Sequence, residues 1–189
     1  MNIILTDVSR YKGNRGTWLD VLKYYITNPS FRVIFLFRLY HLWHHFLSKL
    51  PLGVVLFSFY YKHICRQSGI QLSLCAEIGE GFKFEHFGGI VIGAIKIGKN
   101  CNIFHNVTLG YAGRWQNGVD GKMGGGSPTI GDNVVIGAGA VVVGRIMIGN
   151  NVFIGANAYV YKDVPENAVV GAMPGKILSY KGTKGYFGH

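Results

Sequence analysis

The sequence is poor in cysteine and in acidic residues, and it lacks long hydrophobic runs. Its three cysteines form an odd set without C-x-x-C spacing, which argues against a disulfide scaffold or a zinc ribbon and favours a reducing cytoplasm. No signal peptide is visible at the N-terminus, and no stretch reaches the about 20 apolar residues of a membrane span. We therefore expect a cytoplasmic protein whose 189 residues bury one or two small cores.

The shortage of acids leaves a large excess of positive charge. Nine Asp and Glu stand against 19 Lys and Arg, so the formal net charge is +10. Residues 1–66 hold nine of these bases and only two acids, Asp7 and Asp20. Such an excess favours an anionic partner, namely nucleic acid, a membrane surface or a phosphorylated small molecule. Because no nucleic-acid recognition motif is present, we expect no nucleic-acid partner.

The second half of the chain contains a six-residue repeat. Glycine follows eight of its twelve aliphatic or aromatic positions. These positions are Ile78, Phe84, Ile92, Ile97, Ile103, Leu109, Ile130, Ile136, Val142, Ile148, Ile154 and Val160. Such a repeat predicts a mainly β fold, a parallel β-helix in which three hexads close one triangular coil. The coils would stack at about 4.8 Å and bury a column of like residues. A β-sandwich is the less favoured alternative.

The repeat is interrupted at "FEHFGGIVIG", residues 84–93. Phe84 to Ile92 spans eight residues instead of six, and Ile92 to Ile97 spans five. We expect the surplus to bulge outward and to carry His86 from the stacked interior toward a cleft between subunits, because local rules tend to fail where function requires it.

With these hexads the chain resembles the left-handed β-helix acyltransferases, and among them the serine acetyltransferase branch. The resemblance covers roughly residues 30–178. It is carried by "FEHFGGIVIG", "NVTLG", "PTIGDNVVIGAGAVVVGRIMIGNNVFIGANAYV" and "KDVPENAVVGAMPGK". It implies a left-handed β-helix, acetyl-CoA as co-substrate and a homotrimer with active sites between neighbouring copies.

The resemblance also implies the catalytic residues. His86 matches the base that takes a proton from the acceptor hydroxyl as that hydroxyl attacks a thioester. Glu85 matches the acid beside this histidine, although an exposed position without a role is equally open for it. His105 is a candidate for substrate binding, with a structural corner role as the alternative. A plain polar corner residue remains the alternative for His86 as well.

The implied donor site lies further along the chain. Gly110, Ala138 and Ala156 match positions where close backbone approach admits the pantetheine arm. Lys162 and Lys176 match basic residues that meet the phosphates of CoA. A solvated basic tail is the alternative interpretation of the two lysines.

A long loop interrupts the repeat at residues 110–129. It holds 20 residues, of which seven are glycine. Loops of this length inside a compact domain are normally functional or disordered. We expect this loop to shape the acceptor pocket, with Arg114 and Trp115 as its substrate-binding residues.

Three regions follow from these patterns. We expect a helical segment over residues 1–70, the β-helix acyltransferase domain over residues 71–170 and a basic tail over residues 171–189. The resemblance implies that the helices cap the first coil, because an open β-helix end needs cover. Their aromatic and basic residues also suit peripheral contact with the inner face of a membrane.

Three departures from the family bear on the acceptor. Gln71 stands where the family has an acid that orients the base, and Gly126 and Ser127 stand where an arginine and a histidine handle serine. These departures and the possible membrane contact of the N-terminal segment lead us to expect O-acetylation of a small-molecule or lipid-linked sugar in surface-polysaccharide biosynthesis. Serine O-acetylation feeding cysteine synthesis is the alternative, and a non-catalytic β-helix scaffold is the second. No metal is expected, since the histidines lack the spacing of a three-histidine site.

Overall fold

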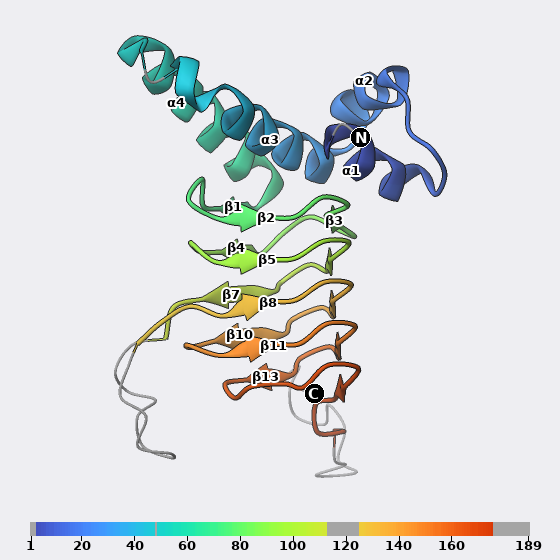
Figure 1. Cartoon of the computed structure of the whole chain (residues 1–189). Coiled ribbons are helices and arrows are strands. Elements are labelled where there is room, and N and C mark those ends of the chain that lie inside the picture. Colours follow the sequence, from blue (N-terminus) through green and yellow to red (C-terminus); the bar gives the residue numbers. More distant parts are fainter. Residues whose placement is uncertain (1–2, 48, 113–124, 176–189) are drawn as a thin grey trace, which may run out of the picture.

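A column of short parallel strands carries a layer of helices at one end (Figure 1). The computed structural model describes residues 3–47, 49–112 and 125–175. The predicted site residues Arg114, Trp115 and Lys176 lie outside the described residues. The described part of the chain forms the helices α1 (Ile3–Lys12), α2 (Trp18–Thr27), α3 (Pro29–Leu47) and α4 (Pro51–Ser68).

The strands that follow form three parallel sheets, the faces of a prism. Sheet 1 contains β1 (Ile70–Leu72), β4 (Ile90–Ile92), β7 (Thr108–Gly110), β10 (Val141–Val143) and β13 (Tyr159–Val160). Sheet 2 contains β2 (Glu77–Ile78), β5 (Lys96–Ile97), β8 (Thr129–Ile130) and β11 (Met147–Ile148). Sheet 3 contains β3 (Lys83–Phe84), β6 (Asn102–Ile103), β9 (Val135–Ile136), β12 (Phe153–Ile154) and β14 (Val169–Val170).

From β1 to β13 successive strands visit the three sheets in turn, so that each round of three is one coil. Between β13 and β14 the chain pairs with sheet 2 only through a single bridge of Val164 to Ile148. Equivalent residues of neighbouring coils pair in register, as in the sheet 2 column of Ile78, Ile97, Ile130 and Ile148. All four isoleucines are buried. The predicted fold class is confirmed: a mainly β, parallel β-helix of hexapeptide repeats, preceded by an α-helical segment.

Asparagines with left-handed backbone angles turn the chain at the corners. Asn133 and Asn151 have φ of 56° and 57°, which the short polar side chain tolerates. Their side chains also join the coils. Asn100 donates to Asn133 (3.2 Å), Asn133 to Asn151 (3.0 Å) and Asn151 to Asn167 (3.0 Å). This ladder ties neighbouring coils together along one edge.

The helical layer covers the open edge of the first coil. Arg38 of α3 donates to the backbone oxygens of Ile78 (2.5 Å) and Gly79 (2.6 Å). Arg38 also forms a buried ion pair with Asp7 of α1 at 2.8 Å. Asp7 in turn accepts a hydrogen bond from the backbone nitrogen of Phe82 (3.0 Å). A sheet edge without such partners would leave its backbone groups unpaired.

Two tyrosines complete this cover. Tyr11 accepts a hydrogen bond from the backbone nitrogen of Phe84 (3.0 Å). Tyr61 of α4 donates to the backbone oxygen of Leu72 (2.9 Å). Side chains from three helices therefore take the place of a preceding coil.

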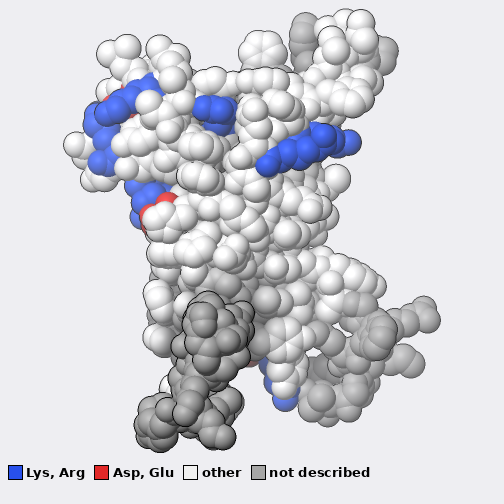
Figure 2. All heavy atoms as spheres, turned by 180° about the vertical axis from the view of Figure 1, so that it is seen from behind, with Lys and Arg blue, Asp and Glu red and all other residues white. Residues whose placement is uncertain are grey.

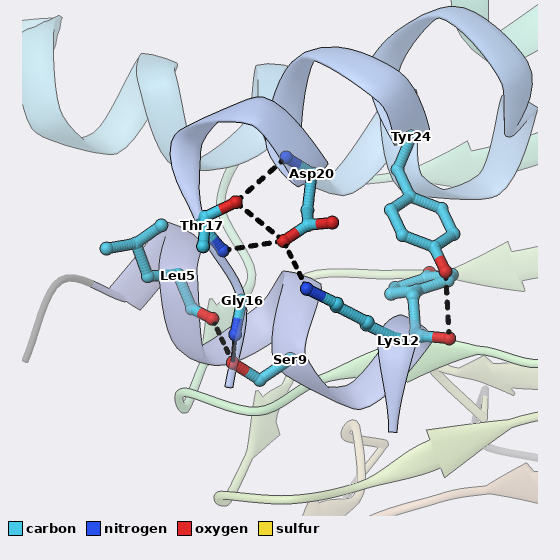
Figure 3. Close-up of polar contacts among 8 residues, drawn as sticks. Leu5, Ser9, Lys12, Gly16, Thr17, Asp20 and Tyr24 are labelled. Atoms are coloured by element: carbon cyan, nitrogen blue, oxygen red, sulfur yellow. Dashed lines mark hydrogen bonds and ion pairs between the residues drawn. The ribbon is translucent and has the colours of Figure 1, made fainter. Parts of the chain in front are cut away.

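A capping box of Thr17 and Asp20 begins α2, and Lys12 of α1 binds the same aspartate (Figure 3). Asp20 accepts hydrogen bonds from the backbone nitrogen of Thr17 (2.9 Å) and from Lys12 (2.8 Å), and its own backbone nitrogen donates to the Thr17 hydroxyl (3.3 Å). The hydrogen bond from Lys12, with those from Thr17, lowers the pKa of Asp20 to about 2. Because the pKa is lowered, the ionised Asp20 carboxylate stabilises the folded state at neutral pH. This stabilisation is lost as the pH falls from about 4 through about 2.

Large apolar side chains remain exposed on α2 and α4. On α2 they are Trp18, Leu19, Leu22 and Ile26, and on α4 they are Leu52, Val55, Leu56, Phe59 and Tyr60. Lys and Arg gather over the same helical layer on the face shown in Figure 2. Among the described residues, no helix combines the length and the apolar character that crossing a membrane requires.

Replacing Asp7 with alanine tests the cover of the first coil. The variant leaves Arg38 buried and unpaired, so the free energy of unfolding should fall by about 3–5 kcal/mol. The control is Glu77→Ala, which removes an exposed ion pair with Lys96 and should cost about 1 kcal/mol at most. Urea denaturation measures both, and equal losses in the two variants would contradict the predicted anchoring role.

Candidate functional site

The corner that leads from sheet 3 to sheet 1 follows a fixed pattern in the regular coils. The first residue of the corner donates its backbone N–H to the next coil, as Phe104 does to the oxygen of Ile136 (3.0 Å). The residue directly after it accepts from the next coil, as the oxygen of His105 does from Gly139 (3.0 Å). These two roles therefore fall on adjacent residues.

In the first coil the same two roles are separated. Glu85 donates to the oxygen of Ile103 (2.9 Å), but the next acceptor is Gly88, whose oxygen binds the N–H of Asn106 (3.0 Å). The two residues between them, His86 and Phe87, are the surplus of the eight-residue step, and they lie outside the ladder of inter-coil hydrogen bonds. The outward bulge expected from the sequence is therefore present.

The bulge directs the His86 side chain outward. His86 is exposed, and its ring centroid lies 5.6 Å from that of His105 and 6.0 Å from that of Phe104. The backbone returns to the ladder through Gly88 (φ 101°) and Gly89 (φ 66°). His105 contributes a second imidazole, and its Nδ1 is buried without a hydrogen-bond partner among the described residues.

The Glu85 carboxylate is engaged elsewhere. It forms an ion pair with Lys83 at 2.7 Å and accepts a hydrogen bond from the Asn102 amide (2.7 Å). Arg10 of α1 donates to the same amide (2.7 Å). Lys83 and Asn102 are register partners in sheet 3. The carboxylate therefore joins a network on the surface of sheet 3, and its partners in the described chain do not include His86.

The bulge lies at one end of a column formed by a histidine and two alanines. Register pairs Ile103 with Ile136 and Ile136 with Ile154, so the residues two positions later also stack. These residues are His105, Ala138 and Ala156, and the oxygen of Ala138 accepts from the next coil at 2.8 Å. His86, His105 and two of the predicted donor-site residues thus share one edge of the prism.

The other predicted donor residues lie on a different edge. Gly110 ends β7, and a Cβ atom placed on it would meet nothing within 4 Å. The turn at His105 and Asn106 (φ 57°) and the strand β7 separate it from His105. Lys162 follows β13 at the same edge as Gly110, and its Nζ lies 5.8 Å from the Tyr161 ring centroid. One copy of the chain therefore does not bring all predicted donor residues together.

A groove of about 730 Å³ adjoins the bulge on the outer side of sheet 1. Gln71 and Gly89 line it from the prism, and Lys62, Cys65 and Arg66 line it from α4. Burial raises the pKa of the Cys65 thiol, so this group is uncharged at neutral pH. The sequence did not predict that Lys62, Cys65 and Arg66 border the site. Their spacing places them on one face of a helix but does not indicate which part of the protein that face contacts.

Nothing in the described ranges gathers three or more His, Cys, Asp or Glu side chains that could hold a metal ion. The groups gathered near the bulge are the imidazoles of His86 and His105, backbone groups and the cations of α4.

Comparison with known proteins adds independent evidence. Residues 127–162 match the family "Bacterial transferase hexapeptide (six repeats)". The serine acetyltransferase of Synechococcus elongatus is 36% identical over 168 residues, which cover 88% of this chain and 62% of that protein. The serine acetyltransferase of Synechocystis is 38% identical over 88% of this chain and 61% of its own length.

Solved structures agree with this result. A serine acetyltransferase in complex with cysteine superposes with a TM-score of 0.70 at 28% identity, covering 94% of this chain and 69% of the other. The Neisseria gonorrhoeae serine acetyltransferase in complex with serine gives a TM-score of 0.67 at 26% identity, over 93% of this chain and 67% of that one.

The match over residues 127–162 and the stacked parallel sheets confirm the resemblance to hexapeptide-repeat acyltransferases that the sequence predicted. Within this class it is similar to the serine acetyltransferases, which confirms the predicted resemblance. The chain spans about three fifths of the length of the curated relatives described above.

The comparisons correct one expectation. The predicted main function, acetylation of a sugar in surface-polysaccharide biosynthesis, is wrong. The relatives are serine acetyltransferases, and one was solved with serine bound. Residues 71, 126 and 127, even together with a possible membrane-facing N-terminus, therefore do not suffice to predict the acceptor.

Gly88→Ala tests how the bulge is held. A methyl group at Gly88 meets nothing within 4 Å, so its cost comes from φ alone, about 1–2 kcal/mol or more. Gly13 (φ 84°) has the same open space and serves as the control. Both alanine variants should lose stability in urea denaturation, but only Gly88→Ala should shift the imidazole NMR signals of His86 and His105. A like shift in both variants, or in neither, would contradict this account.

Proposed function

We propose that the chain is an acetyl-CoA-dependent O-acetyltransferase whose acceptor is the hydroxyl group of L-serine. The observation that carries the proposal is the position of His86, outside the ladder at one end of the Ala138–Ala156 column. The similarity to serine acetyltransferases supports the choice of acceptor, and the structure of a serine acetyltransferase with CoA supports the donor.

In the proposed reaction His86 is the general base. Its unprotonated ring nitrogen takes the hydroxyl proton of serine while the oxygen attacks the thioester carbonyl of acetyl-CoA. A new C–O bond forms, and the carbonyl oxygen carries the negative charge of a tetrahedral intermediate, which backbone N–H groups can stabilise. The C–S bond then breaks, and the imidazolium returns its proton to the thiolate of CoA.

The donor is proposed to lie along the edge that carries His86. The small side chains of Ala138 and Ala156 would admit the pantetheine arm there, and Lys162 and Lys176 would meet the phosphates. Gly110 and Lys162 lie on the other edge of sheet 1, so one copy alone does not form a continuous donor site. In a threefold ring the edge of one copy that carries His86 can face the edge of its neighbour that carries Gly110. This geometry supports the proposal of a homotrimer.

The other predicted residues receive narrower roles. Glu85 is proposed to position His86 indirectly. Its carboxylate binds Lys83 and Asn102 and so holds the end of β3, from which His86 projects. His105 is proposed to hold the His86 ring by packing. Contact of Arg114 and Trp115 with the acceptor stays a prediction from the sequence.

His86→Ala tests the reaction. Loss of a general base should lower kcat with L-serine and acetyl-CoA by about a hundredfold or more, measured by the release of the CoA thiol. His63→Ala is the control, because this histidine is exposed on α4 and has no proposed role. Equal rates for wild type and His86→Ala would overturn the proposal. No serine-dependent release by the wild type would favour the non-catalytic scaffold.

Light scattering tests the assembly. The purified chain should have three times the mass of one copy, and a monomer at micromolar concentration would overturn the trimer.

Peripheral membrane contact is proposed for the exposed apolar side chains of α2 and α4, such as Trp18 and Phe59. When the protein is mixed with anionic vesicles, light scattering should show that the mass of the vesicles increases by bound protein. An unchanged vesicle mass would refute the membrane contact.

A further inference from the structure

The groove beside the bulge carries positive charge and no negative charge. Lys62 and Arg66 lie one turn apart on α4 and are the charged residues among those that line it. Like charges at this spacing repel each other on a helix surface. An anion placed between the two would remove that repulsion.

The acids near this end of the molecule are all engaged elsewhere. Residues 3–112 contain five of them, and each forms an ion pair with a different base. These pairs are Asp7–Arg38, Asp20–Lys12, Glu77–Lys96, Glu80–Lys99 and Glu85–Lys83. In the described part of the chain no ion pair includes Lys62 or Arg66, so both cations are available to a ligand.

The lining is largely apolar, with side chains such as Ile70, Leu72 and Val91, but it also holds uncharged polar groups. Gln71, Ser58 and Ser73 supply an amide and two hydroxyl groups, and the Cys65 thiol is uncharged. The planar guanidinium of an arginine can bind a carboxylate through two parallel hydrogen bonds, and an ammonium adds a point charge. Such a set can bind and orient a carboxylate.

The end of α4 lies directly against the bulge. Gly69 caps α4 in the left-handed conformation (φ 63°), and its oxygen accepts a hydrogen bond from Ile90 (3.1 Å). A Cβ atom on Gly69 would lie 3.1 Å from the Cα of Gly88. Gly89, three residues after His86, lines the same groove. An anion bound by Lys62 and Arg66 would therefore lie on the side of the prism where the chain rejoins the ladder of hydrogen bonds after the bulge.

We propose that Lys62 and Arg66 form the carboxylate subsite of the acceptor, so that α4 selects acceptors that carry a carboxylate next to the hydroxyl that His86 deprotonates. This inference rests on the proposed function. It assigns to a helix of the N-terminal layer a direct part in acceptor specificity, in addition to its contacts with the first coil.

The test compares L-serine with L-serine methyl ester, which keeps the hydroxyl and the amine but loses the negative charge. The wild type should prefer L-serine. In Lys62→Ala/Arg66→Ala the KM for L-serine should rise tenfold or more, the size expected for lost hydrogen bonds to a charged group. The KM for acetyl-CoA should stay unchanged, and the preference over the ester should disappear. Lys49→Ala removes one positive charge of the same helical layer and Gln67→Ala shortens a neighbouring exposed side chain of α4, so both should behave as wild type.

The outcomes separate the inference from the proposed function. An unchanged KM and an unchanged preference in the double variant would overturn the carboxylate subsite and leave serine acetylation standing. An equal rise in the KM values for L-serine and its ester would overturn it as well, because a general disturbance of α4 does not depend on the carboxylate. If the wild type acetylates neither compound, the proposed function fails, and the subsite fails with it.

Discussion

The stacked interior of the prism is the constraint on which the rest of the structure depends. Phe84, Ile92 and Ile103 are almost completely buried, and each coil is hydrogen-bonded to the next. A close-packed interior of this kind has no space for extra side chains. Two surplus residues in one coil can therefore only leave the stack toward solvent. This explains why the position of His86 follows from the packing of residues that have no chemical role.

The second constraint is the open edge of the first coil, and it links the helical layer to the site. Side chains such as Asp7, Arg38 and Tyr61 pair with backbone groups or neighbours that a preceding coil would otherwise satisfy. The same packing sets the end of α4 against Gly88, at the foot of the bulge. The cover of the β-helix and the wall of the groove are thus formed by one set of contacts, so a change in the helices affects both.

The acceptor shows where reasoning from matched positions fails. Gln71, Gly126 and Ser127 lack the charges that handle serine in the resembled family, and this absence led to the prediction of a sugar. Matched positions carry no information about positive charge that another element supplies. In the structure Lys62 and Arg66 line the groove beside Gln71. A charge on one helix and a position on one strand become neighbours only through packing, which spacing along the chain does not reveal.

The sequence by itself determined the β-helix, because the six-residue spacing of buried positions such as Ile130, Ile136 and Val142 is visible without knowing which coils pair. It also determined that a surplus exists between Phe84 and Ile92, since this needs only counting. Only the tertiary structure decided that His86 and Phe87 are the two residues outside the ladder, because inter-coil hydrogen bonds define that register. It likewise decided that α4 borders the site, since helix docking depends on which side chains satisfy the first coil.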